Sequence, residues 1–422
     1  MASFVENFRK AFPNAISKED AANPFKLVKA VGNVVRDNAQ KSRENREAVV
    51  NSTFQTKSDG TNYGVGTDGR TYSYAVNNNK IVNFKPVSIE EQKAAINDLT
   101  GGNIKIENSI KDPVSLTNIH RSVSRMYNYG NKNLTPDKVN MYDRREKSQF
   151  SDGAMGLAWD NTYLEKPDEV ELMMTDYPKD IAEQNKKSVE KGRHTGKIYG
   201  DIIPTHELSH TAQFAIDEIT DRWMSEQEKK AQENYNKYPA DKLFKQAISK
   251  LFGKDYELTE KDSVGYDIYQ KALDKWEKWN EERGGNNGVI MLNNFNKAAK
   301  NAGFNNVLEA AASISDYAAE RREVYDGDNS YYAEPNLEEI FAEAYTDVLL
   351  NEDDAKPFSK ELIRLYSDTA DEWSRKTGRN KGKNFKEFQE MFSILPDFEV
   401  AAQKSPAELF MRHYKTLPKR NK

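Results

Sequence analysis

The stretch His206-Glu207-Leu208-Ser209-His210 stands out in this 422-residue chain because its residue types and their spacing could do chemistry. On a helix, the two histidines at i and i+4 lie one above the other on the same face. Two imidazoles placed in this way can bind one tetrahedral Zn²⁺ ion together. The glutamate that follows the first histidine can then take a proton from a zinc-bound water. The pattern therefore predicts a zinc site with Glu207 as general base.

The residues on both sides of the motif favour a buried helix. Pro204 suits a first helical turn, and Thr205 is of a type that caps helices. Apolar residues precede and follow the motif, at Ile202-Ile203 and Phe214-Ala215-Ile216. Unpaired histidines inside such a helix would be costly, and the chain has only five histidines. We therefore expect the two histidines of the motif to bind a metal ion.

A third ligand must come from elsewhere in the chain. It cannot be a thiolate, since the sequence has no cysteine. The metzincin arrangement is excluded, because the sixth residue after the motif is Ile216. Residues 336–349 have helical periodicity and place Glu339, Glu343 and Asp347 at i, i+4 and i+8. Three carboxylates stacked in this way repel one another unless cations compensate them. A Zn²⁺ ion and the ring N–H of a ligating histidine would provide this compensation.

Residues 206–210 and the segment Glu339-Ile340-Phe341-Ala342-Glu343-Ala344-Tyr345 resemble a family of gluzincin-type zinc metallopeptidases. This family includes the catalytic domain of anthrax lethal factor and the Pro-Pro endopeptidases. The resemblance implies His206, His210 and Glu339 as the zinc ligands and Glu207 as the base. The implied function is a zinc-dependent endopeptidase that hydrolyses peptide bonds by the attack of a zinc-bound water.

The same resemblance implies roles for two further residues. Tyr332 lies seven residues before Glu339, at the spacing of the tyrosine that stabilises the oxyanion in this family. Glu343 corresponds to a glutamate that supports the site by hydrogen bonding. A thermolysin-like register is the alternative, because Glu343 and Asp347 have the Glu-x-x-x-Asp spacing of gluzincins. In that register Glu343 is the ligand and Asp347 supports it, whereas the position of Tyr332 favours Glu339.

The sequence predicts an α+β fold, in which a mainly helical zincin-like domain with a small sheet is joined by a β-rich N-terminal module and helical appendages. The gap of 129 residues between His210 and Glu339 is longer than this family usually has, which predicts a helical insertion. The predicted segments are a helical arm (1–50), a small β-meander module (51–115), the metallopeptidase domain (116–355) with its insertion (218–315), and a C-terminal helical appendage with a basic tail (356–422).

Local signals predict several turns, caps and strands. Asp68-Gly69 and Asn77-Asn78-Asn79 are hairpin signals, and Ser88 with Glu91 forms a capping box at the start of a helix. Met155–Trp159 and Val170–Met174 are predicted strands. In many zinc peptidases, a strand just before the motif helix forms the sheet edge along which an extended peptide lies. We expect residues 170–175 to be that edge.

Two other histidines are expected to lie away from any functional site. His120 falls within a predicted helix over residues 114–127, where a structural histidine with satisfied hydrogen bonds is expected. His194 lies between Gly192 and Gly196 in a charged stretch, where a solvated loop is expected.

Composition restricts the partners of the chain. Its hydrophobic content is 37% and its formal net charge is −5, so we expect neither nucleic-acid binding nor membrane association. The first ten residues have no apolar core of signal-peptide length, so we expect a soluble protein that is cytoplasmic, virion-associated or delivered without Sec export. The expected partner is a protein or peptide substrate.

Two alternative functions remain open at this point. One is a structural or cargo protein of a virus particle that carries a peptidase-like domain, and the other is a toxin-like effector protease. The terminal helical segments, which lie outside the predicted catalytic domain, would then dock to a larger assembly or serve delivery.

Overall fold

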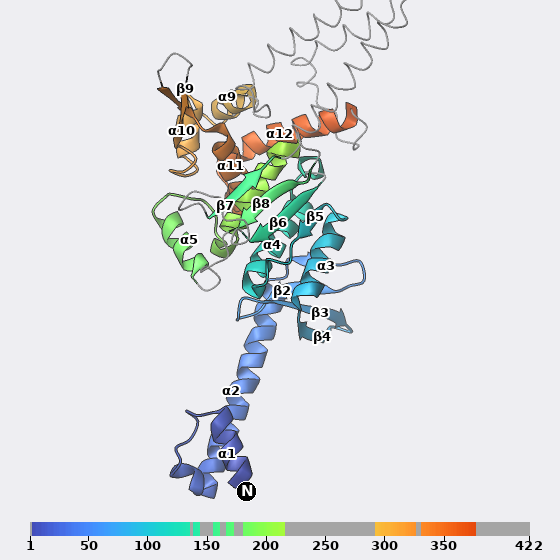
Figure 1. Cartoon of the computed structure of the whole chain (residues 1–422), viewed down its shortest axis with the longest axis vertical. Coiled ribbons are helices and arrows are strands. Elements are labelled where there is room, and N and C mark those ends of the chain that lie inside the picture. The colour runs from blue at the N-terminus through green and yellow to red at the C-terminus, as the bar shows by residue number, and fades with distance from the viewer. Residues whose placement is uncertain are drawn as a thin grey trace, which may run out of the picture. The chain divides into compact units, whose positions relative to one another are not determined.

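The structure of the protein is a computed structural model (Figure 1). It describes residues 2–135, 138–143, 155–160, 166–172, 180–215, 292–325 and 331–376. The chain forms two compact units. One unit consists of Met1–Asp98 and Ile110–Ser124, and the other of Leu99–Ser109 and Arg125–Lys422.

The first unit contains a four-stranded antiparallel sheet. Its strands pair in chain order and are β1 (Gln55–Thr56), β2 (Asn62–Val65), β3 (Thr71–Asn77) and β4 (Lys80–Pro86). In the β3–β4 turn, Asn78 and Asn79 have φ angles of 47° and 60°, which asparagine adopts more readily than most residues. Gly69, in the β2–β3 turn, has a φ angle of 77°. The predicted β-meander and both predicted turns are confirmed.

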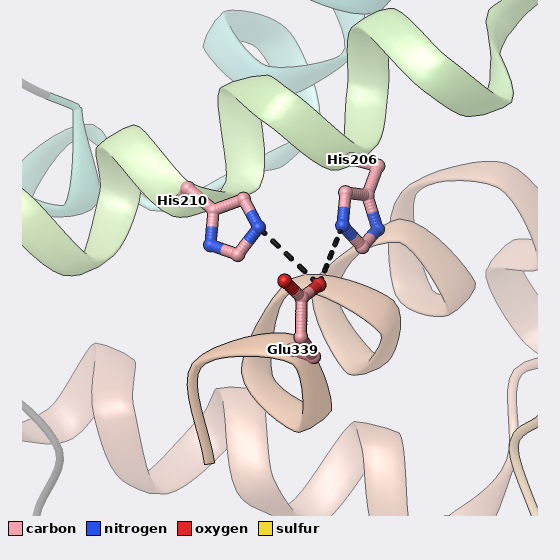
Figure 2. A group of neighbouring side chains, drawn as sticks. All are labelled: His206, His210 and Glu339. Atoms are coloured by element: carbon pink, nitrogen blue, oxygen red, sulfur yellow. Dashed lines mark hydrogen bonds and ion pairs between the residues drawn. The ribbon is translucent and has the colours of Figure 1, made fainter. Parts of the chain in front are cut away.

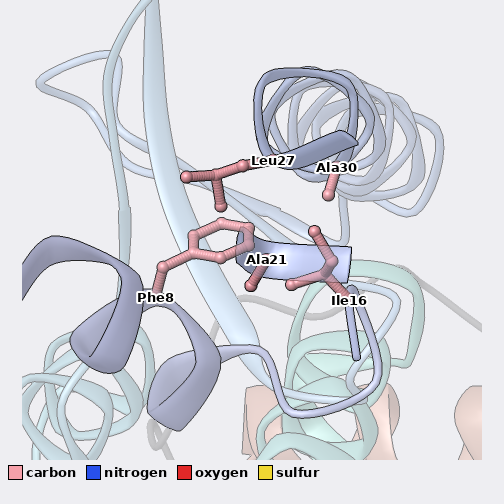
Figure 3. Packing of buried hydrophobic residues seen from close by; sticks show 5 residues of the cluster. All are labelled: Phe8, Ile16, Ala21, Leu27 and Ala30. Atoms are coloured by element: carbon pink, nitrogen blue, oxygen red, sulfur yellow. The ribbon is translucent and has the colours of Figure 1, made fainter. Parts of the chain in front are cut away.

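Two helices and a short 3₁₀ segment precede this sheet. They are α1 (Ala2–Ala11), η1 (Asp20–Ala22) and α2 (Pro24–Asn51). The Asn23 side chain caps α2 by accepting a hydrogen bond of 3.0 Å from the backbone N–H of Phe25. A small apolar core joins the three elements, and Figure 3 shows its residues Phe8, Ile16, Ala21, Leu27 and Ala30. The predicted N-terminal helices are therefore present.

Two further helices are α3 (Ile89–Thr100) and α4 (Pro113–Tyr129). The predicted capping box begins α3: the backbone N–H of Ser88 donates to Glu91 Oε2 at 3.0 Å, and that of Glu91 donates to Ser88 Oγ at 3.2 Å. His120 on α4 is fully buried, and its Nε2 lies 2.5 Å from Gln55 Oε1. The prediction of a structural histidine at position 120 is confirmed, but its hydrogen bonds are only partly satisfied, because Nδ1 is buried without a partner among the described residues.

The second unit contains a four-stranded mixed sheet of order β5-β6-β8-β7. Its strands are β5 (Ile104–Ile106), β6 (Val139–Asp143), β7 (Gly156–Trp159) and β8 (Asp168–Leu172). The first three strands in this order are parallel, whereas β7 is antiparallel to β8. Both strands predicted in this region are present: Met155–Trp159 corresponds to β7, which begins one residue later, and the described residues 170–172 of Val170–Met174 lie in β8.

The expectation that residues 170–175 form the edge of the sheet is wrong where the structure describes them. Residues 170–172 belong to β8, which pairs with β6 on one side and with β7 on the other. Residues 173–175 lie outside the described part of the chain. Among the described strands, β7 lies at this edge. The sequence predicted both strands but could not order them within the sheet.

The other elements of the second unit are mainly helical. They are η2 (Lys132–Leu134), α5 (Ile181–Glu190), η5 (Tyr199–Asp201), a helix over residues 202–215, α9 (Leu292–Asn301), α10 (Val307–Ala312), the antiparallel pair β9 (Arg321–Tyr325) and β10 (Tyr331–Pro335), α11 (Leu337–Asn351), η7 (Glu352–Asp354) and α12 (Pro357–Lys376). Helix α11 was predicted from its periodicity, and this prediction is confirmed.

Aromatic packing positions α11. The Tyr366 ring on α12 is fully buried, and its centroid lies 4.6 Å from that of Phe341 on α11 and 5.8 Å from that of Phe295 on α9. Figure 1 shows these three helices side by side. Burial of such rings is strongly stabilising, so this cluster holds α11 in place. The helix predicted over residues 362–373 lies within α12, whereas that predicted over residues 385–392 lies outside the described part.

The predicted fold class is confirmed: the protein is α+β, mostly helical with small sheets. The four predicted segments stay predictions, and residues 218–291 of the predicted insertion lie outside the described part of the chain. None of the helices described combines the length and the apolar character needed to cross a bilayer.

The burial of His120 predicts that acid weakens the folded state. Burial lowers the pKa of His120 from 6.5 to about 3, so between these pH values the unfolded chain binds a proton that the folded chain does not. Stability therefore falls as the pH falls below about 6.5, by up to about 1.4 kcal/mol per pH unit. The free energy of unfolding should accordingly drop more between pH 7 and pH 5 in wild type than in His120→Gln. Equal drops in the two proteins would contradict this prediction.

Candidate metal centre

The sequence motif lies on the helix over residues 202–215, so its predicted helical conformation is confirmed. Asp201, directly before this helix, is fully buried and lies 2.5 Å from the guanidinium of Arg125. Thr205 was expected to cap the helix. It lies inside the helix instead, and its carbonyl accepts a hydrogen bond of 2.8 Å from the Ser209 hydroxyl. The apolar residues of this motif helix, which are at most 2% exposed, are Ile202, Leu208, Ala212 and Ala215.

Two histidines of the motif helix and one glutamate of α11 meet at one point. Glu339 Oε2 lies 3.0 Å from His206 Nε2 and 3.5 Å from His210 Nε2. Figure 2 shows both imidazoles pointing from the motif helix toward this carboxylate. The two rings lie edge to face with centroids 4.9 Å apart. The structure thus brings Glu339 to two motif histidines that lie far from it in the sequence.

The geometry of these three side chains fits a divalent metal ion. One ligand atom from each lies within 4.8 Å of the other two. In a tetrahedral zinc site with bonds of about 2.0–2.1 Å, neighbouring ligand atoms are about 3.3 Å apart. The separations of 3.0 and 3.5 Å lie on either side of this value. Two imidazoles and a carboxylate suit Zn²⁺ and also other first-row divalent ions, so the structure supports a metal site without identifying its metal.

The charges in the site are strongly coupled. Burial alone would lower the pKa of His206, but hydrogen bonds to Glu339 and Glu343 raise it well above its ordinary value. Burial alone would raise the pKa of Glu339, but hydrogen bonds from both imidazoles hold it far below its usual range. The Glu339 carboxylate is therefore ionised and directed at both imidazoles. A divalent cation between these groups would meet a negative oxygen at short range.

The Nδ1 atom of each histidine has its own partner. His206 Nδ1 lies 3.1 Å from Glu343 Oε1, and His210 Nδ1 lies 3.0 Å from Gln213 Oε1. An Nδ1–H group that donates to such an oxygen leaves the Nε2 lone pair of the same ring free to bind a metal. Gln213 also donates to the carbonyl of Glu338 at 3.3 Å, which ties the motif helix to α11.

The position of Glu343 bears on the two possible registers. Its carboxylate is fully buried and faces Nδ1 of His206, whereas Glu339 faces Nε2 of both histidines. Asp347, the supporting residue in the thermolysin-like register, is also fully buried. It accepts hydrogen bonds from the Thr195 hydroxyl at 2.8 Å and from the backbone N–H of Lys356 at 2.7 Å. The geometry therefore favours Glu339 as the ligand.

His194 lies in a loop as expected, but the expectation that it is solvated and away from any functional site is wrong. Its side chain is 24% exposed, and its Nδ1 lies 3.2 Å from Glu343 Oε1. The Ser315 hydroxyl donates to Glu343 Oε2 at 2.7 Å. Burial alone would raise the pKa of Glu343, but the hydrogen bonds of His194 and His206 lower it to about 2. The sequence signal that could have found His194 is the set of carboxylates Glu339, Glu343 and Asp347 on α11, which need hydrogen-bond donors from other parts of the chain.

Glu207 lies beside the edge strand β7. A Cβ atom on Gly156 would lie 2.5 Å from both Cγ and Oε1 of Glu207. Glycine therefore leaves space for this carboxylate, which no larger residue would do without moving it. Burial raises the pKa of Glu207, although the two nearby imidazoles oppose the effect. The predicted base thus lies against strand β7, next to His206 in the motif.

Two tyrosines, Tyr332 and Tyr317, are relevant to the site. Tyr332 lies in β10, opposite Val324 of β9, but its side chain is outside the described part of the structure and its predicted role stays a prediction. Tyr317 was not predicted. The centroid of its ring lies 5.7 Å from that of His206 and 4.8 Å from that of His194. No spacing rule links Tyr317 to the motif, so these ring contacts could not be found from the sequence.

Comparisons of the chain with protein-family models, with curated proteins and with solved structures found no match. The case for a metal site therefore rests on the His206, His210 and Glu339 triad.

Metal analysis of purified variants should identify the ligands. We expect about one metal ion per chain in wild type and its loss in Glu339→Ala. Glu343→Ala removes the partner of His206 Nδ1 and should weaken metal binding by roughly 10- to 100-fold. Elemental mass spectrometry together with a chelator competition would measure both effects.

Glu338→Ala is the matched control, because Glu338 is the adjacent residue of α11 and its side chain is 41% exposed. This variant should retain its metal. Full occupancy in Glu339→Ala with loss in Glu343→Ala would establish the thermolysin-like register instead.

Proposed function

We propose that this chain is a zinc-dependent endopeptidase of the type that the resemblance to the lethal factor and Pro-Pro endopeptidase group implies. The observation that carries the proposal is the convergence of His206 Nε2 and His210 Nε2 on Glu339 Oε2, in a motif that places Glu207 beside them. A histidine pair with a carboxylate from a second helix is the ligand set of zinc peptidases that use two histidines and a glutamate.

His206, His210 and Glu339 would hold the ion. When bound there, zinc lowers the pKa of a water molecule toward neutrality and polarises the carbonyl of the peptide. Glu207 would accept a proton from the attacking water and would pass it to the leaving amine. This chemistry requires no nucleophilic side chain, in agreement with a sequence that contains no cysteine.

Strand β7 is the proposed binding edge for the substrate. It forms the described edge of the mixed sheet, and its Gly156 lies against the Glu207 side chain. An extended peptide added along this edge would satisfy its own backbone hydrogen bonds and bring a carbonyl near the base. The proposed substrate is therefore a protein or peptide segment in an extended conformation. Tyr332 is the proposed donor to the developing oxyanion, on the basis of its spacing from Glu339.

Glu207→Gln separates catalysis from metal binding. The amide keeps the size of the side chain but cannot accept a proton. We expect full metal content and a loss of cleavage of about 10²- to 10⁴-fold. The assay is mass spectrometry of a degenerate peptide mixture incubated with the metal-loaded full chain.

Glu338→Gln serves as the control and should cleave as wild type does. Wild type that carries its metal but cleaves no peptide in this mixture would overturn the peptidase proposal and leave the metal site intact.

Gly156→Ala should also separate peptide cleavage from metal binding. The added methyl group would occupy the position of the Glu207 side chain, so we expect the carboxylate to be displaced and cleavage to fall at least 10-fold. Metal content should not change, because the three atoms nearest to the added methyl group all belong to Glu207, which is not a proposed ligand. Ala158→Ser adds one atom on the same strand and should keep its activity. Equal activities of Gly156→Ala and wild type would remove β7 from the proposed binding edge.

A further inference from the structure

We propose that His194 is a positioning residue for the metal centre: it fixes the carboxylate of Glu343 that orients His206. This inference rests on the metal site of the proposed function but not on its peptidase activity. His194 was expected to lie in a solvated loop, and no spacing in the sequence connects it to the motif.

The first observation is that one carboxylate oxygen of Glu343 faces both His194 and His206. Glu343 Oε1 lies 3.1 Å from His206 Nδ1 and 3.2 Å from His194 Nδ1. The second oxygen, Oε2, accepts a hydrogen bond of 2.7 Å from the Ser315 hydroxyl. Both oxygens are thus held while the carboxylate has no exposure to solvent. The orientation of Glu343 therefore depends on His194 and Ser315 as well as on His206.

The second observation is that His194 is itself held in place. The carbonyl oxygens of Gly192 and Arg193 accept hydrogen bonds from the backbone N–H groups of Asp316 and Tyr317, at 2.8 and 3.1 Å. The Tyr317 ring then contacts both His194 and His206, with centroid separations of 4.8 and 5.7 Å. Because His194 is fixed in this way, it can in turn fix the carboxylate of Glu343.

The third observation is that Thr195, the residue after His194, also binds a carboxylate of α11, one helical turn beyond Glu343. The Thr195 hydroxyl donates to Asp347 Oδ1 at 2.8 Å. His194 and Thr195 thus bind carboxylates at successive i, i+4 positions of α11. Asp347 contacts neither motif histidine in the structure. The two adjacent residues therefore allow the support of Glu343 to be separated from the general attachment of this segment to α11.

These contacts predict a specific effect on metal affinity. Without His194, the Glu343 carboxylate loses one of the donors that hold Oε1 and can turn away from His206. Hydrogen-bond partners of this kind outside the ligand set typically contribute 10- to 100-fold to metal affinity. Since His194 is one step further from the metal than Glu343, we expect the lower end of this range.

The test is the zinc affinity of the full chain, measured by competition with a chelator of known affinity. We expect His194→Ala to weaken zinc binding roughly 10-fold. His194→Asn should restore most of this loss, because its amide nitrogen can donate from about the position of Nδ1. The absorption spectrum of the Co²⁺-substituted protein should shift in His194→Ala and return toward that of wild type in His194→Asn.

Thr195→Val is the matched control. It removes the hydrogen bond to Asp347 on the same segment and should keep zinc affinity within about twofold, even where it lowers the melting temperature as much as His194→Ala does. Unchanged zinc affinity in His194→Ala, an equal loss in Thr195→Val, or no rescue by His194→Asn would each overturn the proposal. Failure of wild type to bind zinc would instead overturn the metal centre itself.

Discussion

The burial of carboxylates on one face of α11 is the constraint on which the site depends. Glu343 and Asp347 have no exposure to solvent, and the Glu339 side chain is 22% exposed. An ionised carboxylate removed from water without partners costs several kcal/mol. Each of these three groups therefore needs donors or cations from outside its own helix. The aromatic core around Tyr366 holds α11 so that this face cannot turn toward solvent.

This need explains why three separate segments lie against α11. The motif helix brings His206 and His210 to Glu339, and the segment that follows α5 brings His194 to Glu343 and Thr195 to Asp347. The backbone N–H of Lys356 supplies a further donor to Asp347. The hydrogen bonds that stabilise the buried charges of Glu339 and Glu343 are thus the same ones that orient the imidazoles, whereas those of Asp347 hold other segments against α11. Stability and the geometry of the metal centre have one physical origin.

His206 occupies the centre of this arrangement, because its two nitrogens face two different carboxylates. Nε2 lies 3.0 Å from Glu339 and Nδ1 lies 3.1 Å from Glu343. The ring is therefore fixed in both position and rotation. Glu207 has a different environment, since it lies against Gly156 and burial raises its pKa. Neighbouring carboxylates in one site thus differ in their affinity for protons, as a division between ligand and base requires.

Much of the fold was predictable, because its signals are local. Asn78 and Asn79 adopt a turn conformation that asparagine tolerates, and Ser88 with Glu91 caps α3 by hydrogen bonds over three residues. The strand order was not predictable in the same way. Residues 170–172 have the alternation of a strand, but pairing with β6 and β7 on both sides is a property of the whole sheet.

The sequence by itself determined that the two motif histidines share one face of a helix and that Glu339, Glu343 and Asp347 share one face of another, since helical periodicity sets both. Only the tertiary structure decided that Glu339 faces Nε2 while Glu343 faces Nδ1, and that His194 belongs beside them. The reason is that periodicity specifies which side chains share a face but not which face of another helix they meet. That choice depends on packing between segments more than 130 residues apart in the chain, such as His206 and Glu339.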